Sequence, residues 1–369
     1  MMSLLIPNPG VAPVRRPAAK SGRLISFTLL PKPGETAREI CHRLAEQLAK
    51  SGAVPLHLLV FGKCNASGAV TDSLRKVFGS IDWPITWVEG TGCGKHPLAG
   101  LQVHACTGAV ERVQSQGGLL ASVFTNGGAR QCFAGGIMPA NLQLSNADQT
   151  RCALYDLKMV LAEAGFELAD IVRTWFYLDD ILSWYNDFNQ ARTAIYAGLK
   201  FNTGSMPAST GIGARNPTGA ALALAAWAFR PMQTNSYAEE VASPLQCPAP
   251  AYGSSFSRAM EISTNHGRQL FISGTASIAP GGKTEWVGNA RQQVNLTMEV
   301  VEAILRSRGF AFKGLSRATA YFRHASDAGI FSEWLAARQL SNLPVVSTQC
   351  DVCRDDLLFE LEGEALSAD

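Results

Sequence analysis

An internal repeat constrains the fold of this chain more than any other feature of its sequence. The segment AGFELADIVRTWFYLDD around Gly165 returns as RGFAFKGLSRATAYFRH around Gly309. The same offset aligns Arg173 with Arg317. A repeat of this length is typical of duplicated structural units. We therefore interpret the chain as tandem copies of one unit.

Only one of the two copies ends in an acidic strand. Each copy continues into a segment led by a proline, at Pro207 in the first copy and at Pro344 in the second. The last strand of the first copy is rich in alanine and leucine, whereas that of the second carries Glu360 and Glu362. A duplicated fold that keeps acidic residues in one copy indicates a scaffold with a single specialised site.

Each full copy predicts a β-hairpin, a long helix, a strand, a shorter helix and two further strands. Gly165 and Gly309 stand at helix ends that favour a left-handed residue. A third, shorter copy precedes them, with two helices, a proline-led strand at Pro84 and a last strand GLQVHAC, but no obvious opening hairpin. Helices on one face of a small mixed sheet predict the α+β fold class.

We divide the chain into an N-terminal extension and three units, of which the first is degenerate. A polar segment that contains prolines separates the second unit from the third and is interpreted as a linker. The predicted boundaries are 1–34 for the extension, 35–113, 114–235 and 253–369 for the units, and 236–252 for the linker.

The composition argues against several classes of function. The net charge is +2, and no basic run or basic-aromatic stripe indicates nucleic-acid binding. No apolar run approaches the roughly 20 residues of a membrane helix, and prolines break the apolar stretch at the N-terminus. The nine cysteines lack disulfide-like spacing, which fits a reducing compartment. We expect a cytoplasmic protein that binds neither nucleic acid nor membrane.

The pattern of units resembles the YjgF/Rid superfamily, roughly over residues 115 to 364 and less fully over 35 to 110. The small subunits of that superfamily form trimers whose sheets line a central barrel, with sites at the subunit interfaces. The resemblance implies tandem Rid-like (chorismate-mutase-like) units in an intramolecular pseudo-trimer, monomeric or weakly oligomeric. Its deaminase members carry an arginine two residues after the proline equivalent to Pro344. That place is taken here by Val346, Ser209 and Thr86.

Five segments resemble those of the chorismatases within this superfamily: RTWFY at 173–177, MPASTGIGA at 206–214, YGSSFSRA at 252–259, FISGTASI at 271–278 and DVCRDDLLFELEG at 351–363. Chorismatases remove the enolpyruvyl group of chorismate as pyruvate, leaving a dihydroxycyclohexadiene acid or a hydroxybenzoate. The chain departs from their pattern at Phe176, where they carry an asparagine, and at 279–282, where they usually carry a Gly-His pair. The resemblance implies a small carboxylated substrate, chorismate, and no cofactor.

Strand alternation sends Glu360 and Glu362 to the face opposite the apolar side chains of the same strand. We expect two carboxylates on a partly buried face to raise each other's pKa, which suits a general acid near neutral pH. The resemblance puts this role on Glu360, with Glu362 in support. The structural alternative is an acidic rim strand paired with arginines.

A dianionic substrate needs fixed cations, and the planar guanidinium suits carboxylates. The candidates for substrate binding are Arg173, Arg192, Arg258, Arg323 and Arg354, although any one arginine is more often a surface residue. Tyr252 is a candidate to line a pocket for an aromatic acid, but strand aromatics more often pack in the core.

Cys350 and Cys353 form a CxxC pair without a second pair or a histidine cluster, so we expect no metal site. The resemblance puts Gly274 and Cys353 at pocket positions where chorismatase branches differ, and their combination resembles the hydroxybenzoate-forming branch. We count Cys353 with the catalytic residues, against the alternative of a small core residue. Two other functions stay open: an imine or enamine hydrolase on another carboxylated metabolite, and a non-catalytic binder of small molecules.

Overall fold

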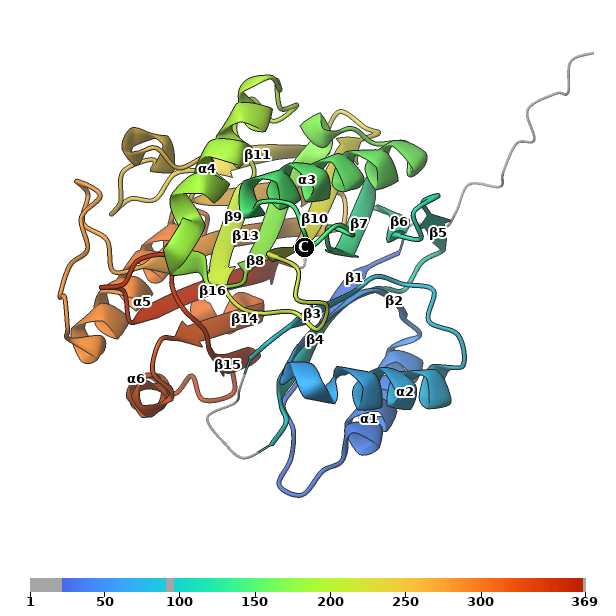
Figure 1. The fold of residues 1–369 in the computed structure, drawn as a ribbon, viewed down its shortest axis with the longest axis horizontal. Helices are drawn as coiled ribbons and strands as arrows, with labels where there is room; N and C mark the ends of the chain where they lie inside the picture. Colours follow the sequence, from blue (N-terminus) through green and yellow to red (C-terminus); the bar gives the residue numbers. More distant parts are fainter. Residues whose placement is uncertain (1–21, 91–95, 368–369) are drawn as a thin grey trace, which may run out of the picture.

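The computed structural model describes residues 22–90 and 96–367 as three sheets, each accompanied by a pair of helices (Figure 1). The helix pairs lie on three different sides of the molecule, and the strands fill the space between them. The α+β class and the three tandem units are confirmed.

The first sheet contains β1 (Leu24–Leu29), β2 (Val54–Gly62), β3 (Ile85–Val88) and β4 (Leu98–Cys106), with α1 (Ala37–Ser51) and α2 (Ser67–Phe78). The second contains β5 (Val110–Gln114), β6 (Leu120–Asn126), β7 (Ala129–Ile137), β8 (Ile171–Leu178), β9 (Ala208–Gly213) and β10 (Leu222–Pro231), with α3 (Asn146–Glu163) and α4 (Ile181–Ala197). The third contains β11 (Tyr237–Val241), β12 (Ala259–Thr264), β13 (Gly267–Ala276), β14 (Leu315–Phe322), β15 (Val345–Gln349) and β16 (Phe359–Ser367), with α5 (Ala290–Ser307) and α6 (Ala328–Ala337).

The three sheets share one strand order. The orders are β1-β4-β2-β3, β5-β6-β7-β10-β8-β9 and β11-β12-β13-β16-β14-β15. A short edge strand follows Pro84, Pro207 and Pro344 in turn and pairs in parallel with its neighbour. Each proline precedes the edge strand of its unit, as predicted, but the strand registers place Pro207 one residue earlier than Pro84 and Pro344. β1 takes the place of β7 and β13, and within the described residues the first sheet has no counterpart of the strands before them.

Local sequence signals account for the helix ends. α1 begins at a capping box, in which the Thr36 side chain accepts from the backbone of Glu39 and the Glu39 side chain accepts in return. Gly165 and Gly309 follow the long helices α3 and α5 with φ of 76° and 74°. Both therefore adopt the left-handed conformation that was predicted for them.

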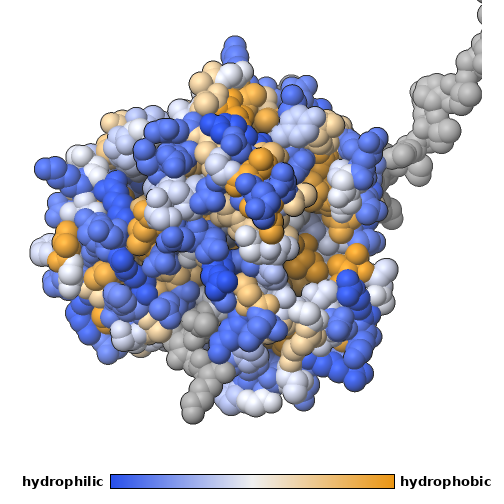
Figure 2. Space-filling model, in the orientation of Figure 1, coloured by the Kyte–Doolittle hydropathy of each residue, from blue (hydrophilic) through white to orange (hydrophobic). Residues whose placement is uncertain are grey.

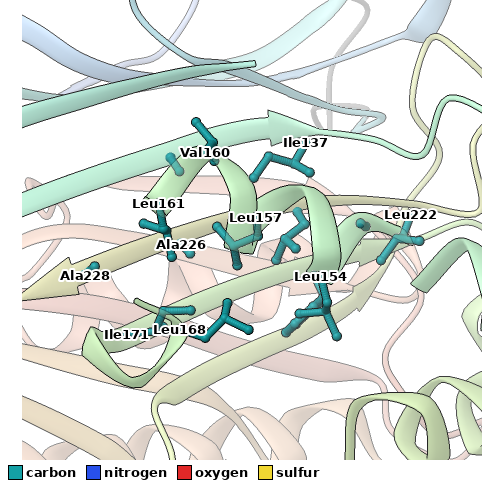
Figure 3. Close-up of a cluster of buried hydrophobic side chains, with 14 of the residues drawn as sticks. Ile137, Leu154, Leu157, Val160, Leu161, Leu168, Ile171, Leu222, Ala226 and Ala228 are labelled. Carbon is teal, nitrogen blue, oxygen red and sulfur yellow. The ribbon is translucent and has the colours of Figure 1, made fainter. Parts of the chain in front are cut away.

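Each helix pair packs its apolar stripe onto its own sheet. In the second unit, Leu154, Leu157 and Leu161 of α3 point onto the strands that carry Ile137 and Ala226 (Figure 3). Spacing of three and four residues brings these leucines onto one helix face. The face of the molecule in Figure 2 is mostly hydrophilic with scattered hydrophobic patches. None of the described helices is long and apolar enough to span a membrane.

The opposite faces of the three sheets meet in a shared core. This core contains aromatic residues from all three units, among them Phe61, Phe133, Trp175, Trp227, Phe271 and Tyr321. The edge strand of each unit packs on the next sheet, β3 on β7, β9 on β13 and β15 on β4. The units thus follow one another around a pseudo-threefold axis.

The central barrel that the resemblance implied is not formed by the described residues, in which the three sheets stay separate. Neighbouring units are joined by side-chain packing and by isolated bridges, such as the one from Ala208 to Ser257, rather than by continuous ladders. The expectation of a barrel was therefore wrong, although the inward-facing sheets were predicted correctly.

Candidate active site

The strand registers place Glu360, Ala223 and Gly100 at equivalent positions of the three central strands. Each lies opposite an aromatic residue of the neighbouring strand: Tyr321, Tyr177 and Phe61. These three rings contact one another near the pseudo-threefold axis. The third unit alone has a carboxyl group at this position, so the duplicated scaffold is specialised there.

Three glutamates, not two, share the inner face of β16. Glu360, Glu362 and Glu364 are all buried, while the alternate residues Phe359 and Leu361 pack in the core under α5 and α6. The alternation of inward and outward side chains continues to Glu364. The predicted strand ended at Glu362 and therefore did not include it. The row runs from the contact between units two and three into the shared core.

Glu362 is the most extensively hydrogen-bonded of the three. Its Oε2 accepts from Arg173 Nη2, from Trp175 Nε1 at 2.7 Å and from Thr210 Oγ1 at 2.7 Å. Its Oε1 accepts from Arg317 Nη2 and Tyr321 OH, both at 3.1 Å. Burial acts to raise its pKa, but Arg317, Arg173 and Thr210 outweigh burial and hold the pKa below its usual value. Glu362 is therefore a fixed anion, and the expectation that both carboxylates have raised pKa values was wrong for it.

Glu364 is a second fixed anion. Arg317 Nε donates to its Oε1 at 2.9 Å, and His104 Nε2 lies 2.9 Å from its Oε2. Burial acts to raise the pKa of Glu364, but His104 and Arg317 lower it to about 2. Because His104 comes from the first unit, the anchoring of this row involves all three units.

Glu360 differs from its two neighbours in having no hydrogen-bonding partner within the described part of the chain. Its side chain is only 4% exposed. Burial and the adjacent charge of Glu362 raise its pKa to about 8, and Arg173 and Arg258 oppose the shift only in part. Near neutral pH this carboxyl group is therefore mostly protonated, as a general acid requires.

A recess of about 510 Å³, including its open mouth, reaches Glu360 between units two and three. The second unit contributes Tyr185, Arg192, Ser209 and Gly211 to its wall. The remaining lining comes from the third unit and the segment before it: Tyr252, Ser254, Phe256, Arg258, Gly274, Ala276, Ile278, Cys353, Arg354 and Glu360. The structure thus brings together six of the nine predicted site residues, Glu360, Cys353, Arg192, Arg258, Gly274 and Tyr252, and also Arg354.

Two of the lining arginines are buried and have donors without partners. Arg192 stacks on Phe188, and its Nε is unpaired among the described residues. Arg258 stacks on Tyr252 and donates from Nε to the carbonyl of Cys247 at 3.0 Å, but its Nη2 is unpaired there. Buried donors without partners are costly. Both side chains line the recess, so an anionic ligand there would meet guanidinium groups whose hydrogen bonds the described residues leave incomplete.

The other three predicted site residues lie outside the recess. Glu362 and Arg173 form the buried ion pair behind it. Arg323 lines a separate depression with Glu89, Asp179 and Asp351. Glu362 and Arg173 can therefore act on a ligand in the recess only indirectly. Arg323 lies near no other predicted site residue.

Sequence reasoning missed Tyr185, Thr210 and Arg317 as parts of the site. Tyr185 lines the recess from α4, directly after Trp184, a non-helical residue that ordinary helical periodicity does not reveal. Thr210 lies in the proline-led strand of the second unit, one residue beyond the Ser209 that was aligned with the superfamily's arginine. Arg317 aligns with Arg173 in the repeat, and both arginines donate to Glu362. The repeat could therefore have indicated that the two arginines share an acidic partner.

Cys353 lines the recess as a neutral thiol. Burial, with the nearby Glu360, raises its pKa to about 12, so it is not a ready nucleophile. Cys350 and Cys353 are both free. The described residues contain no group of three or more side chains suited to hold a metal ion.

Comparisons with known proteins agree with this architecture. Residues 128–221 match the family model described as Endoribonuclease L-PSP. A 3-hydroxybenzoate synthase of Streptomyces hygroscopicus is 27% identical over 258 residues, which cover 63% of this chain and 72% of that protein. A chorismatase of the same organism is 27% identical over 236 residues, covering 59% and 67% respectively. The chain carries a YjgF/Rid domain and is a homologue of the chorismatases.

A chorismatase crystal structure matches 94% of this chorismatase homologue and 99% of its own chain, with a TM-score of 0.67 and 20% identity. The shared fold therefore extends over 94% of the chain, well beyond residues 128–221 that match the family model. The relatives are named as enzymes.

Proposed function

We propose that this chain converts chorismate to a hydroxybenzoate and pyruvate, with Glu360 as the general acid. The observation that carries the proposal is a protonated, unpaired carboxyl group at the end of a recess lined by three arginines. The names and the similarity of the relatives support a chorismatase-like function.

The acid has a defined task in this reaction. Protonation of the enolpyruvyl methylene gives an oxocarbenium-like centre, which water or the ring hydroxyl captures before pyruvate leaves. A pKa of about 8 keeps the Glu360 proton available at neutral pH without making it too weak an acid to transfer it. The carboxylate that remains can accept the ring proton that is released on aromatisation.

The proposed reaction balances without an oxidant, a reductant or an organic cofactor. A hydroxybenzoate and pyruvate together contain the same atoms as chorismate. Where water captures the oxocarbenium-like centre, its oxygen leaves in pyruvate, and one water is then lost from the ring diol on aromatisation. Where the ring hydroxyl captures that centre, no water is added. Acid and base catalysis by the chain's own residues therefore accounts for the conversion.

The walls of the recess suit an aromatic dianion. The unpaired donors of Arg192 and Arg258, together with Arg354, offer guanidinium groups for two carboxylates. Tyr252 and Phe256 each lie against the Arg258 guanidinium and present ring surface to the recess. A planar ring product would pack against such surfaces.

Gly274 and Cys353 support the hydroxybenzoate product through their small size. Both line the recess beside Glu360, so a ring can approach the acid closely. We propose that this approach favours capture by the ring's own hydroxyl over capture by free water.

The superfamily's imine chemistry has less support here. The place of its substrate-binding arginine is taken by Ser209 in the second unit, and the neighbouring Thr210 is hydrogen-bonded to Glu362 rather than open to a ligand. A non-catalytic binder would have no need of an acid with a raised pKa.

The proposal is tested by incubating the purified chain with chorismate and measuring pyruvate and the aromatic product over time. We expect stoichiometric release of pyruvate and a hydroxybenzoate without added metal or cofactor. Release no faster than that from chorismate alone would refute the proposed activity. Pyruvate with an imine substrate but not with chorismate would favour the alternative.

A further inference from the structure

The hydroxyl group of Thr210 lies where the second unit, the third unit and the row of glutamates meet. It accepts from Arg173 Nη2 at 2.6 Å and from the backbone amide of Gly274 at 3.1 Å, and it donates to Glu362 Oε2 at 2.7 Å. A hydroxyl has one proton and two acceptor positions. All three are used, so the proton of Thr210 has no acceptor other than Glu362.

Thr86 occupies the equivalent position at the contact between the first and second units. Thr86 pairs with Leu59, and Thr210 pairs with Trp175. Each of these partners lies two residues before the inward-facing aromatic residue of its strand. The register therefore aligns Thr86 with Thr210, and not with Ser209 as the spacing from the prolines implied.

The two threonines share one contact and differ in the other. The amide of Gly136 donates to Thr86 Oγ1 at 2.9 Å, as the amide of Gly274 does to Thr210. The second partner of Thr86 is His57 Nε2 at 2.8 Å, where Thr210 has Arg173 and Glu362. Both threonines thus accept a hydrogen bond from a glycine amide of the next unit. Of the two, Thr210 alone contacts a carboxylate.

We propose that Thr210 is a positioning residue that holds Glu362 as the charged neighbour of Glu360 and thereby keeps the proposed acid in its protonated form. This inference rests on the proposed role of Glu360. Thr210 does not touch the substrate recess through its hydroxyl and acts only through Glu362 and Arg173.

Other charged and titratable groups around the two glutamates set the background for this effect. Glu362 faces Arg173 and Tyr177 of β8, Arg317 and Tyr321 of β14, and Glu364 of its own strand. Glu360 faces Glu362, Arg173, Arg258, Cys353 and Tyr185. Substituting Thr210 leaves all of these groups in the chain, so a change in the protonation of Glu360 can be assigned to the lost hydroxyl.

Three variants test the proposal: Thr210→Val, Thr210→Ser and Thr86→Val. Valine keeps the shape of threonine without its hydroxyl, and serine keeps the hydroxyl. In Thr210→Val, Glu362 stays ionised because Arg173, Trp175, Arg317 and Tyr321 still donate to it, but its carboxylate loses a contact that fixes it beside Glu360. Arg173 also loses its bond to Thr210 and is freer to turn toward Glu360, whose pKa it lowers. Both changes lower the pKa of Glu360.

The measurement is kcat/KM on chorismate as a function of pH. For Thr210→Val we expect the alkaline limb to move to lower pH by about one unit, the scale of one hydrogen bond to a charged group. Activity near pH 9 then falls by about tenfold, with a smaller loss near pH 6. Thr210→Ser should retain the wild-type profile. Thr86→Val should lose stability but keep the wild-type pH dependence.

An equal loss at every pH in Thr210→Val, or the same shift in Thr86→Val, would overturn the proposal and leave Thr210 with a structural role alone. A second measurement does not depend on turnover. Infrared difference titration follows the protonated carboxyl band of Glu360, which is assigned by its absence from Glu360→Gln. If wild type does not act on chorismate, the proposed function fails, and an unshifted band in Thr210→Val would still refute the role of Thr210 independently.

Discussion

The carboxyl group of Glu360 occupies the space that a side chain at Gly274 would fill, at the contact between the second and third units. A Cβ atom built on Gly274 would lie 2.0 Å from Oε1 of Glu360. The carboxyl group can therefore occupy its observed position only because residue 274 has no side chain. The backbone of Gly274 is also held by Thr210, so the strand cannot easily move aside.

Gly274→Ala should displace the carboxyl group of Glu360 and lower kcat on chorismate by at least about tenfold, because a misplaced acid loses much of its contribution. The measurement is steady-state pyruvate release. Gly211→Ala is the matched comparison, since a Cβ there would meet only Tyr185 at ordinary contact distances of 3.7 and 3.8 Å. Equal effects of the two substitutions would contradict this explanation.

Gly274→Ala combined with Cys353→Ala tests the origin of the aromatic product. Both positions line the recess next to the acid, and we propose that they set how the ring lies against Glu360. The double variant should release less hydroxybenzoate per pyruvate than the wild type does, as measured by chromatography of both products. An unchanged product ratio would remove these residues from the account of specificity.

Arg192→Gln and Arg258→Gln should each raise KM for chorismate by tenfold or more, because a hydrogen bond to a charged group is lost from a buried site. Arg323→Gln provides the control, since Arg323 lies in a different depression with Glu89 and Asp351. Its kinetic constants should match those of the wild type. If Arg323→Gln raised KM as much as the other two, the recess would not be the binding site.

The raised pKa of Glu360 also predicts a pH-dependent cost to stability. The folded chain keeps a proton on Glu360 up to a pH of about 8, whereas the unfolded chain releases it near its ordinary pKa of about 4.3. The unfolded state therefore holds fewer protons in this window, and stability falls as pH rises through it. Glu360→Gln removes this term, so it should be more stable than wild type above pH 8, by roughly 4–5 kcal/mol at most.

Glu364→Gln should show the opposite behaviour. The pKa of Glu364 is lowered to about 2, so its contribution is present above the unfolded pKa and is lost as pH falls through the folded one. The variant should be less stable than wild type at pH 7, and this difference should shrink in acid. Denaturant midpoints measured from about pH 2 to pH 9 report both effects. A loss of stability in Glu360→Gln at every pH would contradict the raised pKa of Glu360.

Much of the architecture could be predicted from the repeated sequence. The edge strands that follow Pro84, Pro207 and Pro344, and the left-handed glycines after α3 and α5, follow from local signals that each unit carries by itself. The acidic face of β16 followed from strand alternation. The barrel that the resemblance implied is not formed by the described residues. Contacts between the three sheets are made by side chains from different units, which local sequence patterns do not relate.

The different states of the three glutamates could not be read from the strand. Glu360 and Glu362 stand two residues apart and look alike in sequence. Their pKa values move in opposite directions because Arg173, Trp175, Thr210, Arg317 and Tyr321 all converge on Glu362 and none of them hydrogen-bonds Glu360. These donors come from two units, and only the tertiary fold brings them to one carboxylate.

The turnover of Glu360→Gln on chorismate tests the central claim most directly. Glutamine keeps the shape of the side chain but has no proton to give to the enolpyruvyl methylene. General acid catalysis is worth roughly 10²–10⁴ in rate, so pyruvate release by the folded variant should fall by about that factor. KM should change little, because Arg192, Arg258 and Arg354 stay in place. A folded Glu360→Gln that releases pyruvate at near the wild-type rate would contradict the role of Glu360 as the acid.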